Sequence, residues 1–266
     1  MADGEHLQIP GIMVQKQDGF THILLSIKSS ENNLLNPEVM KELQSALSMA
    51  GADGSKLVLL SAVGSIFCCG LDFVYFIRRL TDDRKRESAR MAEAIRSFVN
   101  TFIQFKKPIF VAVNGPAIGL GAFILPPCNL VWANEKAWFQ MPYTTFGQSP
   151  DGCSTVMFSK IMGGASANEM LFCGWKLTAQ EACSKGLVSQ VFWPGTFTQD
   201  VMFHIKELAS CNPVVLEESK SLVWCNMRLE LEQANEWECE VLKKIWGSVQ
   251  DMDSMLRYLH REIDEF

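Results

Sequence analysis

The sequence lacks the features that define several large classes of protein. No apolar run approaches the length of a bilayer span, and the first ten residues, with Asp3, Glu5 and His6, contain no apolar segment like that of a secretory signal. The nine cysteines include the adjacent pair Cys68 and Cys69, but they show neither CxxC spacing nor the spacings of a disulfide framework. We therefore expect a soluble intracellular protein with reduced thiols and no membrane contact.

Motifs for several well-known chemistries are also absent. The sequence has no GxSxG nucleophile elbow and no P-loop, and its four histidines are too widely spaced to form a metal-ligand motif. Gly119 and Gly121 half-match a dinucleotide-binding fingerprint, but Ile124 stands where the third glycine belongs. These absences predict a site without a metal ion or a bound dinucleotide.

Positive charge is scarce, since 24 basic residues stand against 30 acidic ones and the net charge is −6. Such a balance argues against a broad basic face, and so against direct nucleic-acid binding. One basic run lies between Arg78 and Arg90, interrupted by Asp82, Asp83 and Glu87. A solvated helix face explains this run, and the alternative is a rim that meets an anionic ligand such as a phosphorylated nucleotide.

What the sequence does contain is typical of a globular α/β domain. Of its 266 residues, 48% are hydrophobic and 20% are charged, which suffices for a sizeable core. Asn36 followed by Pro37 indicates a helix start, and Asp18 followed by Gly19 between apolar runs indicates a hairpin. Apolar patterns predict strands at 12–17, 20–27, 56–62, 108–113 and 130–133, and helices at 36–50, 84–105 and 120–125, with another starting near residue 71.

The pattern becomes helical after about residue 150. Strands that alternate with helices, followed by a helical last third, predict stacked ββα units with a helical appendage. The later helices are predicted at 154–162, 166–173, 178–185, 197–210, 213–226, 229–246 and 251–263.

Two glycine-bearing loops, residues 65–72 and 114–121, each lie between an apolar strand and a helix. Glycine lets the backbone approach a ligand closely, and amides at the start of a helix point outward with partial positive charge. Two such amides aimed at one point form an oxyanion hole, which stabilises a developing negative oxygen. Spacing alone favours plain strand-to-helix turns for both loops.

The residues of these loops resemble the crotonase superfamily. The strand at 58–61 leads into Phe67–Cys68–Cys69–Gly70–Leu71–Asp72, similar to that superfamily's F-x-x-G-x-D. A Lys-Pro pair at 107–108 leads into residues 115–121, similar to its G-x-A-x-G-x-G, and further similarity lies at 133–139, 177–182 and 186–189. The resemblance covers most of residues 12–265. It implies a crotonase (ClpP-like) spiral of ββα units, with flexible residues 1–11, a core at 12–200 and a helical trimerisation region at 201–266.

A more specific resemblance is to the C-terminal domain of the chromodomain Y-like family. It is carried by residues 102–108, 135–140, 143–153 and 206–211. This resemblance implies a homotrimer in the nucleus, with histone deacetylases and corepressor subunits as partners. Because the sequence holds no chromodomain ahead of this region, we expect a fragment or a short isoform.

The superfamily resemblance also implies where coenzyme A or an acyl-CoA binds. The oxyanion-hole amides fall at Leu71 and Leu120, which would both bond the thioester carbonyl and hold the charge of an enolate. The loops at Cys69, Gly70, Asp72 and Gly121 would line the CoA arm. The resemblance implies no metal.

Two positions depart from the pattern of the hydratases, which use two glutamates for acid–base work. These positions hold Phe123 and Tyr143, and a tyrosine hydroxyl titrates near pH ~10, so ordinary hydratase activity is disfavoured. Phe123 is also expected to crowd the acyl pocket. Asp151 falls where peroxisomal-type enoyl-CoA isomerases carry a glutamate in S-P-E-G, and it would shuttle a proton along an acyl chain. The alternative, slightly favoured, is that Asp151 caps the helix that begins near Cys153.

Three functions are compatible with the resemblance. The first is hydration of crotonyl-CoA to 3-hydroxybutyryl-CoA, which would limit histone crotonylation, with histone acetyltransferase activity as a related proposal. The second is CoA binding without turnover, as a scaffold for histone deacetylases. The third is Δ3,Δ2-enoyl-CoA isomerisation by Asp151. The missing glutamates favour the second, and the intact loops favour CoA binding under all three.

Overall fold

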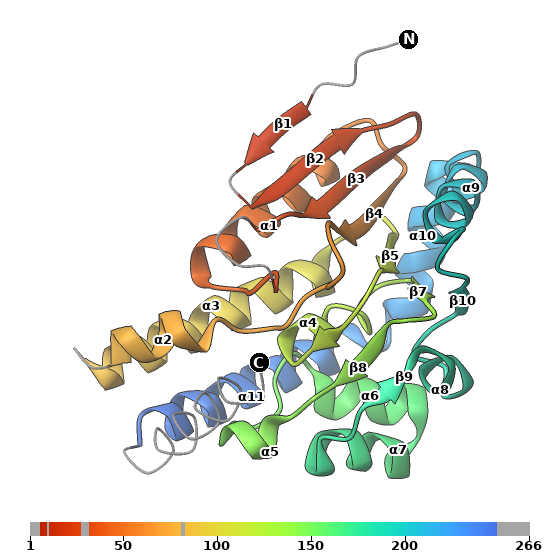
Figure 1. The fold of residues 1–266 in the computed structure, drawn as a ribbon. Coiled ribbons are helices and arrows are strands. Elements are labelled where there is room, and N and C mark those ends of the chain that lie inside the picture. The colour runs from red at the N-terminus through yellow and green to blue at the C-terminus, as the bar shows by residue number, and fades with distance from the viewer. Residues whose placement is uncertain (1–5, 10, 28–31, 81–82, 249–266) are drawn as a thin grey trace.

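The computed structural model describes residues 6–9, 11–27, 32–80 and 83–248 (Figure 1). Its centre is a sheet in the order β1-β2-β3-β4-β5-β7-β10, in which β1 to β3 pair antiparallel and the later strands pair parallel. The strands of this sheet are β1 (His6–Ile9), β2 (Ile12–Lys16), β3 (Phe20–Leu25), β4 (Leu57–Ala62), β5 (Ile109–Val113), β7 (Leu130–Asn134) and β10 (Gln190–Phe192). Because β4 and β5 are parallel neighbours, the two glycine-bearing loops leave the sheet at the same edge.

Local signals explain why several of these elements form. Helix α1 (Pro37–Ala52) begins after Asn36, whose side chain accepts the Val39 amide at 2.9 Å. Strand β5 is buried along its whole length and β4 over its first four residues, as expected for central parallel strands. The predicted hairpin at 12–27 and the predicted cap at Asn36 are confirmed.

Helices cover both faces of the central sheet (Figure 1). On one face, α1 and α3 (Arg84–Gln104) belong to the same buried cluster as Ile23, Leu60 and Val111 of the strands. On the other face, α9 (Phe197–Ala209) packs against Phe110 and Trp132. Between β4 and α3 runs the short helix α2 (Phe73–Leu80).

A second, smaller sheet joins the second glycine-bearing loop to later segments of the chain. It consists of β6 (Ala117–Ile118), β8 (Trp138–Gln140) and β9 (Leu177–Thr178), in the order β6-β8-β9. The candidate site lies on α4 (Leu120–Phe123), which follows β6, on α5 (Tyr143–Phe146), which follows β8, and on the segment that joins α5 to α6 (Ser154–Met162).

The last third of the described chain is mainly helical, as predicted. The long helix α11 runs beside α3 and reaches α6 (Figure 1). The remaining elements are α7 (Gly164–Asn168), a π-helical turn η1 (Glu169–Cys173), α8 (Ala179–Ser184), α10 (Pro213–Trp224) and α11 (Arg228–Trp246). The helix predicted at 251–263 lies outside the described residues.

The shortest strands differ from the prediction. Residues 6–9, predicted to be flexible with the rest of 1–11, form β1 and pair with β2, and residues 1–5 and 10 lie outside the described residues. Within residues 114–119, predicted as a turn, lies β6. Strands of two to four residues are too short to show a period, so backbone pairing rather than side-chain pattern defines them.

Candidate functional site

The two glycine-bearing loops are joined directly to each other. Cys68 forms a parallel bridge with Ala117, and the Ile118 amide donates to the Cys68 carbonyl at 2.9 Å. The Phe67 amide donates to the Pro116 carbonyl at 3.1 Å. The predicted residues of the two loops therefore lie side by side, as the resemblance required.

Glycine is needed where the loops touch. A side chain at Gly70, which has φ +80, would place its Cβ 2.7 Å from the Ile118 carbonyl oxygen and 3.2 Å from the Leu120 nitrogen. A Cβ at Gly121 would lie 2.3 Å from the Cys68 carbonyl oxygen. Both glycines thus permit an approach that any side chain would block.

The amides of Leu71 and Leu120 are available to a ligand. Leu120 is the first residue of α4, so its amide has no partner within the helix. Across residues 32–80 and 83–248, no hydrogen-bond acceptor is found for either amide. Since a Cβ on Gly70 would lie 3.2 Å from the Leu120 nitrogen, the two amides belong to adjoining backbone segments.

Two other predicted loop residues have structural partners. The Cys69 amide donates to the Asn32 carbonyl at 3.0 Å. The Asp72 carboxylate accepts the Tyr75 amide at 2.8 Å, which stabilises the first turn of α2. These contacts hold the first loop in place on both sides of Leu71.

The two positions that hold glutamate in hydratases are buried side chains here. Phe123, at the end of α4, is 1% exposed, and its ring lies so close to Gly152 that a Cβ on that glycine would come within 2.1 Å of it. Tyr143, at the start of α5, is also 1% exposed. Neither position supplies a carboxylate.

Asp151 lies beside Tyr143 at the centre of a buried polar cluster. The Tyr143 hydroxyl donates to Asp151 Oδ1 at 2.5 Å, and Gln148 Nε2 donates to Oδ2 at 2.8 Å. Asp151 is fully buried. The Cys153 and Thr155 amides at the start of α6 donate to Glu238 and not to Asp151, so the alternative that the Asp151 side chain caps α6 is wrong.

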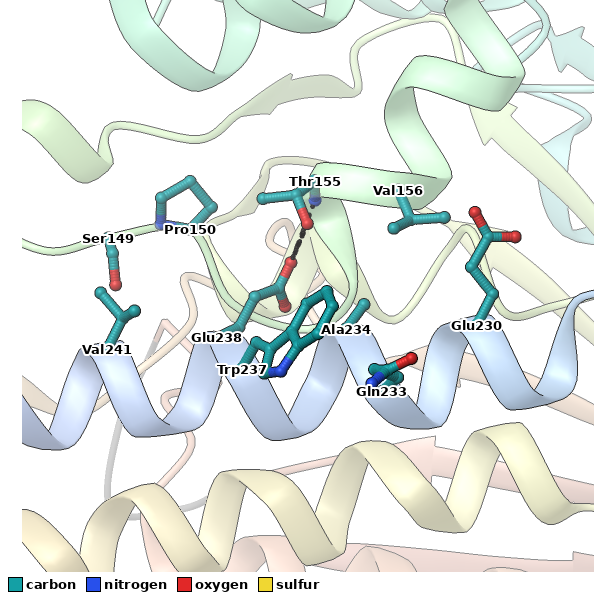
Figure 2. Close-up of a pocket in the computed structure, with 10 residues that line it drawn as sticks. All are labelled: Ser149, Pro150, Thr155, Val156, Glu230, Gln233, Ala234, Trp237, Glu238 and Val241. Atoms are coloured by element: carbon teal, nitrogen blue, oxygen red, sulfur yellow. Dashed lines mark hydrogen bonds between the residues drawn. The ribbon is translucent and has the colours of Figure 1, made fainter.

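The start of α6 is capped instead by Glu238, a residue of α11. Its carboxylate accepts the Cys153 amide at 2.6 Å, the Thr155 amide at 3.1 Å and the Thr155 hydroxyl at 2.5 Å, and Figure 2 shows Glu238 pointing up to Thr155. A carboxylate at a helix N-terminus is favourable, because the first amides lack partners within the helix. Nothing in the sequence near residue 153 points to this contact.

Burial shifts the titration of this cluster. Removal from water raises the pKa of Asp151 to about 7, although hydrogen bonds from Tyr143 and Gln148 act in the opposite direction. Burial, followed by the charge of Asp151, raises the pKa of Tyr143 well above its ordinary value. Burial also raises the pKa of Glu238. The cluster therefore holds a carboxyl group that changes charge near neutral pH.

The raised pKa of Asp151 predicts a pH-dependent stability. Between about pH 4 and about pH 7 the unfolded chain releases the Asp151 proton while the folded chain keeps it, so the free energy of unfolding should fall as pH rises. Asp151→Asn removes this dependence, and its stability relative to wild type should grow across the same window. Urea unfolding of both proteins at several pH values measures this difference. A difference that stays constant with pH would contradict the raised pKa.

A cavity of about 520 Å³ lies between α11 and residues 149–156 (Figure 2). Figure 2 shows Trp237 and Ala234 on the helix facing Pro150 and Val156 across it. The carboxylate of Glu238 closes the side toward α6. The cavity is mainly apolar, and Ser149 and Pro150, which precede Asp151 in the chain, form part of its lining.

Neither a metal-ligand cluster nor a membrane-spanning helix is found among the described residues. Among these residues, no three histidine, cysteine, aspartate or glutamate side chains are grouped as metal ligands. No helix in the same ranges has both the length and the apolar character needed to cross a membrane.

Comparison with known proteins gives the family. Residues 16–266 match the family model for enoyl-CoA hydratase/isomerase. The chain belongs to this family. The predicted crotonase fold, with its ββα units and helical C-terminal region, and the resemblance to the chromodomain Y-like proteins are confirmed.

Individual relatives place the chain more closely. The chromodomain Y-like protein of Mus musculus is 86% identical over 255 residues, which make up 96% of this chain and 43% of that protein. The human enoyl-CoA delta isomerase 2 is 36% identical over 251 residues, or 94% of this chain and 64% of that protein. The chain thus spans less than half the length of the mouse relative. A crystal structure of an enoyl-CoA hydratase/isomerase from Pseudoalteromonas atlantica T6c has a TM-score of 0.84 at 26% identity, covering 94% of this chain and 97% of that one.

Proposed function

We propose that this domain binds an acyl-CoA and holds the thioester oxygen between the Leu71 and Leu120 amides. The observation that carries the proposal is a pair of amides that find no acceptor among the described residues, on two backbone segments that Gly70 and Gly121 bring into contact. Membership in the enoyl-CoA hydratase/isomerase family supports the choice of ligand. Cys69 and Asp72 flank the first amide and would line the CoA arm.

The two amides would do more than bind. When a proton leaves the carbon next to a thioester, negative charge moves to the carbonyl oxygen. Preorganised amides stabilise that charge, and losing one such donor costs roughly 2.7–4 kcal/mol in a well-studied enzyme. No metal is needed for this chemistry, because the backbone supplies the positive ends of the dipoles.

Calorimetric titration with CoA and crotonyl-CoA tests this proposal. We expect both to bind, and crotonyl-CoA to bind more tightly because only it offers a thioester oxygen to Leu71 and Leu120. The titrated sample is then assayed for hydration to 3-hydroxybutyryl-CoA. Equal affinity for CoA and crotonyl-CoA would count against the oxyanion hole, and no binding of either would overturn the proposal.

Between hydration and binding without turnover, the site favours the latter. Phe123 and Tyr143 are buried where hydratases place glutamates, and neither can activate a water molecule as a carboxylate does. The proposal therefore includes the role suggested by the chromodomain Y-like relatives, namely a nuclear CoA-binding scaffold for histone deacetylases and corepressor subunits. Hydration that limits histone crotonylation, and histone acetyltransferase activity, become the less favoured readings of the same resemblance.

A homotrimer is part of this proposal. Helices α10 and α11 expose several large apolar side chains, including Val214, Leu222, Val223 and Leu229, which are 66%, 73%, 68% and 78% exposed in the single chain. Apolar side chains this exposed favour contact with another protein surface. The helical region at 201–266 would supply the contact between subunits.

Isomerisation of a Δ3-enoyl-CoA to the Δ2 form is the second candidate activity. One observation favours it, which is a buried carboxyl at Asp151 with a pKa of about 7, suited to take up and return a proton near neutral pH. The 36% identity to the human enoyl-CoA delta isomerase 2 is consistent with this activity.

A further inference from the structure

Helix α11 carries two stripes of inward-facing side chains, and only one of them is fully packed. The packed stripe includes Leu231, Cys239 and Leu242, which belong to the main buried cluster together with residues of α3. The second stripe lines the cavity of about 520 Å³ (Figure 2). It consists of Glu230, Gln233, Ala234, Trp237, Glu238 and Val241. A surface helix normally needs one inward stripe, so the second indicates a surface for another element.

The large apolar side chains of this second stripe are left in solvent. Trp237 is 65% exposed and Val241 is 46% exposed. Pro150 and Val156 lie on the other wall, so apolar side chains line both sides of the cavity (Figure 2). The Ser149 hydroxyl, which Figure 2 shows directed toward α11, is buried and finds no hydrogen-bond partner in the part of the chain that the structure describes. An exposed tryptophan at an apolar cavity, with a buried hydroxyl left unpaired, is typical of a binding surface.

The shape of the cavity indicates an elongated occupant. From Glu230 to Val241 the stripe covers three helical turns, or roughly 16 Å at 1.5 Å per residue. The opposite wall is formed by the segment before α6 and the first turn of that helix. A helix of another protein binds between such walls by inserting its apolar face, with anchor side chains at i, i+3, i+4 and i+7. A compact small molecule would use only part of this length.

The charge of α11 decides which kind of helix fits. Glu230 and Glu238 are the only charged residues that line the cavity, and both are acidic. Over residues 229–242 the helix holds five glutamates and no lysine or arginine. The Glu238 carboxylate already accepts the amides at the start of α6, whereas Glu230 pairs with Lys160 at 2.9 Å, and both of those side chains are exposed. Because an exposed ion pair contributes little stability, Glu230 can exchange Lys160 for a cation of a partner.

We propose that the cavity between α11 and residues 149–156 is a docking site for a cationic amphipathic helix of a partner protein. The apolar side chains of that helix enter between Trp237 and Val156, and its lysine or arginine side chains meet the carboxylates of α11. The long apolar stems of these cations cover the Trp237 ring, whose π-face attracts the charge. The site does not use the Leu71 and Leu120 amides, so this proposal is independent of acyl-CoA binding.

Fluorescence anisotropy with the labelled amphipathic peptide LKKLLKLLKKLLKL and the whole chain tests the docking site. Wild type should bind this peptide and should not bind its charge-reversed counterpart LEELLELLEELLEL. Trp237→Ala should weaken binding of the lysine peptide roughly tenfold or more. Glu230→Gln, which removes the charge and keeps the shape, should weaken it roughly threefold. Trp193→Ala is the matched control, because it removes a tryptophan that is 68% exposed and does not line the cavity.

Three results would overturn the docking site. The first is a lysine peptide that fails to bind wild type, or binds no better than the glutamate peptide, and this comparison needs no variant. The second is equal peptide affinity of folded Trp237→Ala and Trp193→Ala, which would show that charge alone attracts the peptide elsewhere. The third is an oligomer of wild type that Trp237→Ala dissociates in analytical ultracentrifugation, because a second copy of the chain would then cover the cavity. Thermal melting identifies any variant that has lost its fold.

Discussion

Gly70→Ala is expected to weaken acyl-CoA binding at least tenfold, which corresponds to about 1.4 kcal/mol. The added Cβ would lie 2.7 Å from the Ile118 carbonyl oxygen and 3.2 Å from the Leu120 nitrogen. Both contacts are with backbone, which cannot rotate away as a side chain does. The second loop must move, and the Leu71 and Leu120 amides would no longer converge on one oxygen. Calorimetric titration with crotonyl-CoA measures the loss.

Gly64→Ala separates this collision from backbone strain. Gly64 has φ +91, so alanine there is strained much as it is at Gly70, by roughly 1–2 kcal/mol. Its added Cβ would meet nothing within 4 Å. Gly64→Ala should therefore lose stability while binding crotonyl-CoA normally. Equal affinity of the two alanine variants would show that the contact between the loops does not form the site.

Glu238→Ala is expected to lower the free energy of unfolding by roughly 2 kcal/mol, since it leaves the buried Cys153 amide and two part-buried Thr155 donors without their acceptor. Glu238 accepts three hydrogen bonds, from the Cys153 amide, the Thr155 amide and the Thr155 hydroxyl. These bonds join α11 to the start of α6, a contact between segments far apart in sequence. Urea unfolding measures the change in stability.

Two further variants make this result specific. Glu238→Gln retains one acceptor oxygen and should lose less than half as much stability as Glu238→Ala. Glu236→Ala, two residues earlier on the same helix, removes only an exposed ion pair with Arg96 at 2.9 Å. This variant should change the free energy of unfolding by less than about 1 kcal/mol. If Glu236→Ala proved as damaging as Glu238→Ala, the buried cap would not be what holds α11 in place.

The part of the site that could be predicted rests on backbone chemistry. Gly70 and Gly121 are visible in the sequence, and the loops that carry them follow apolar strands whose parallel pairing brings them to one edge of the sheet. Such features depend on a few neighbouring residues and are visible in the sequence, whereas Leu71 and Leu120 were assigned from the resemblance. The resemblance supplied the role of their amides, which neighbouring residues alone do not define.

The polar cluster was predicted only in part. Asp151 was singled out from its motif, but one alternative made it a helix cap, because a carboxylate shortly before a helix is typical of that role. Its hydrogen bond to Tyr143 depends on how the segment after α5 folds against that helix, and no pattern of neighbouring residues predicts this. No feature of the sequence predicted that Glu238 caps α6, because its partners at the start of that helix lie far earlier in the chain.

The sequence by itself determined the ββα arrangement, the helix that begins after Asn36 and the two loops, because strand period, capping and glycine spacing are local properties. The family came from the resemblance of these segments to known sequences. Only the tertiary structure decided which amides find no acceptor in the part of the chain that the structure describes, that Phe123 packs on Gly152, and that Asp151 is enclosed by Tyr143 and Gln148. A group's pKa and its hydrogen-bond partners depend on burial and on contacts between distant segments. Those are fixed when the helices pack, and no single stretch of sequence contains them.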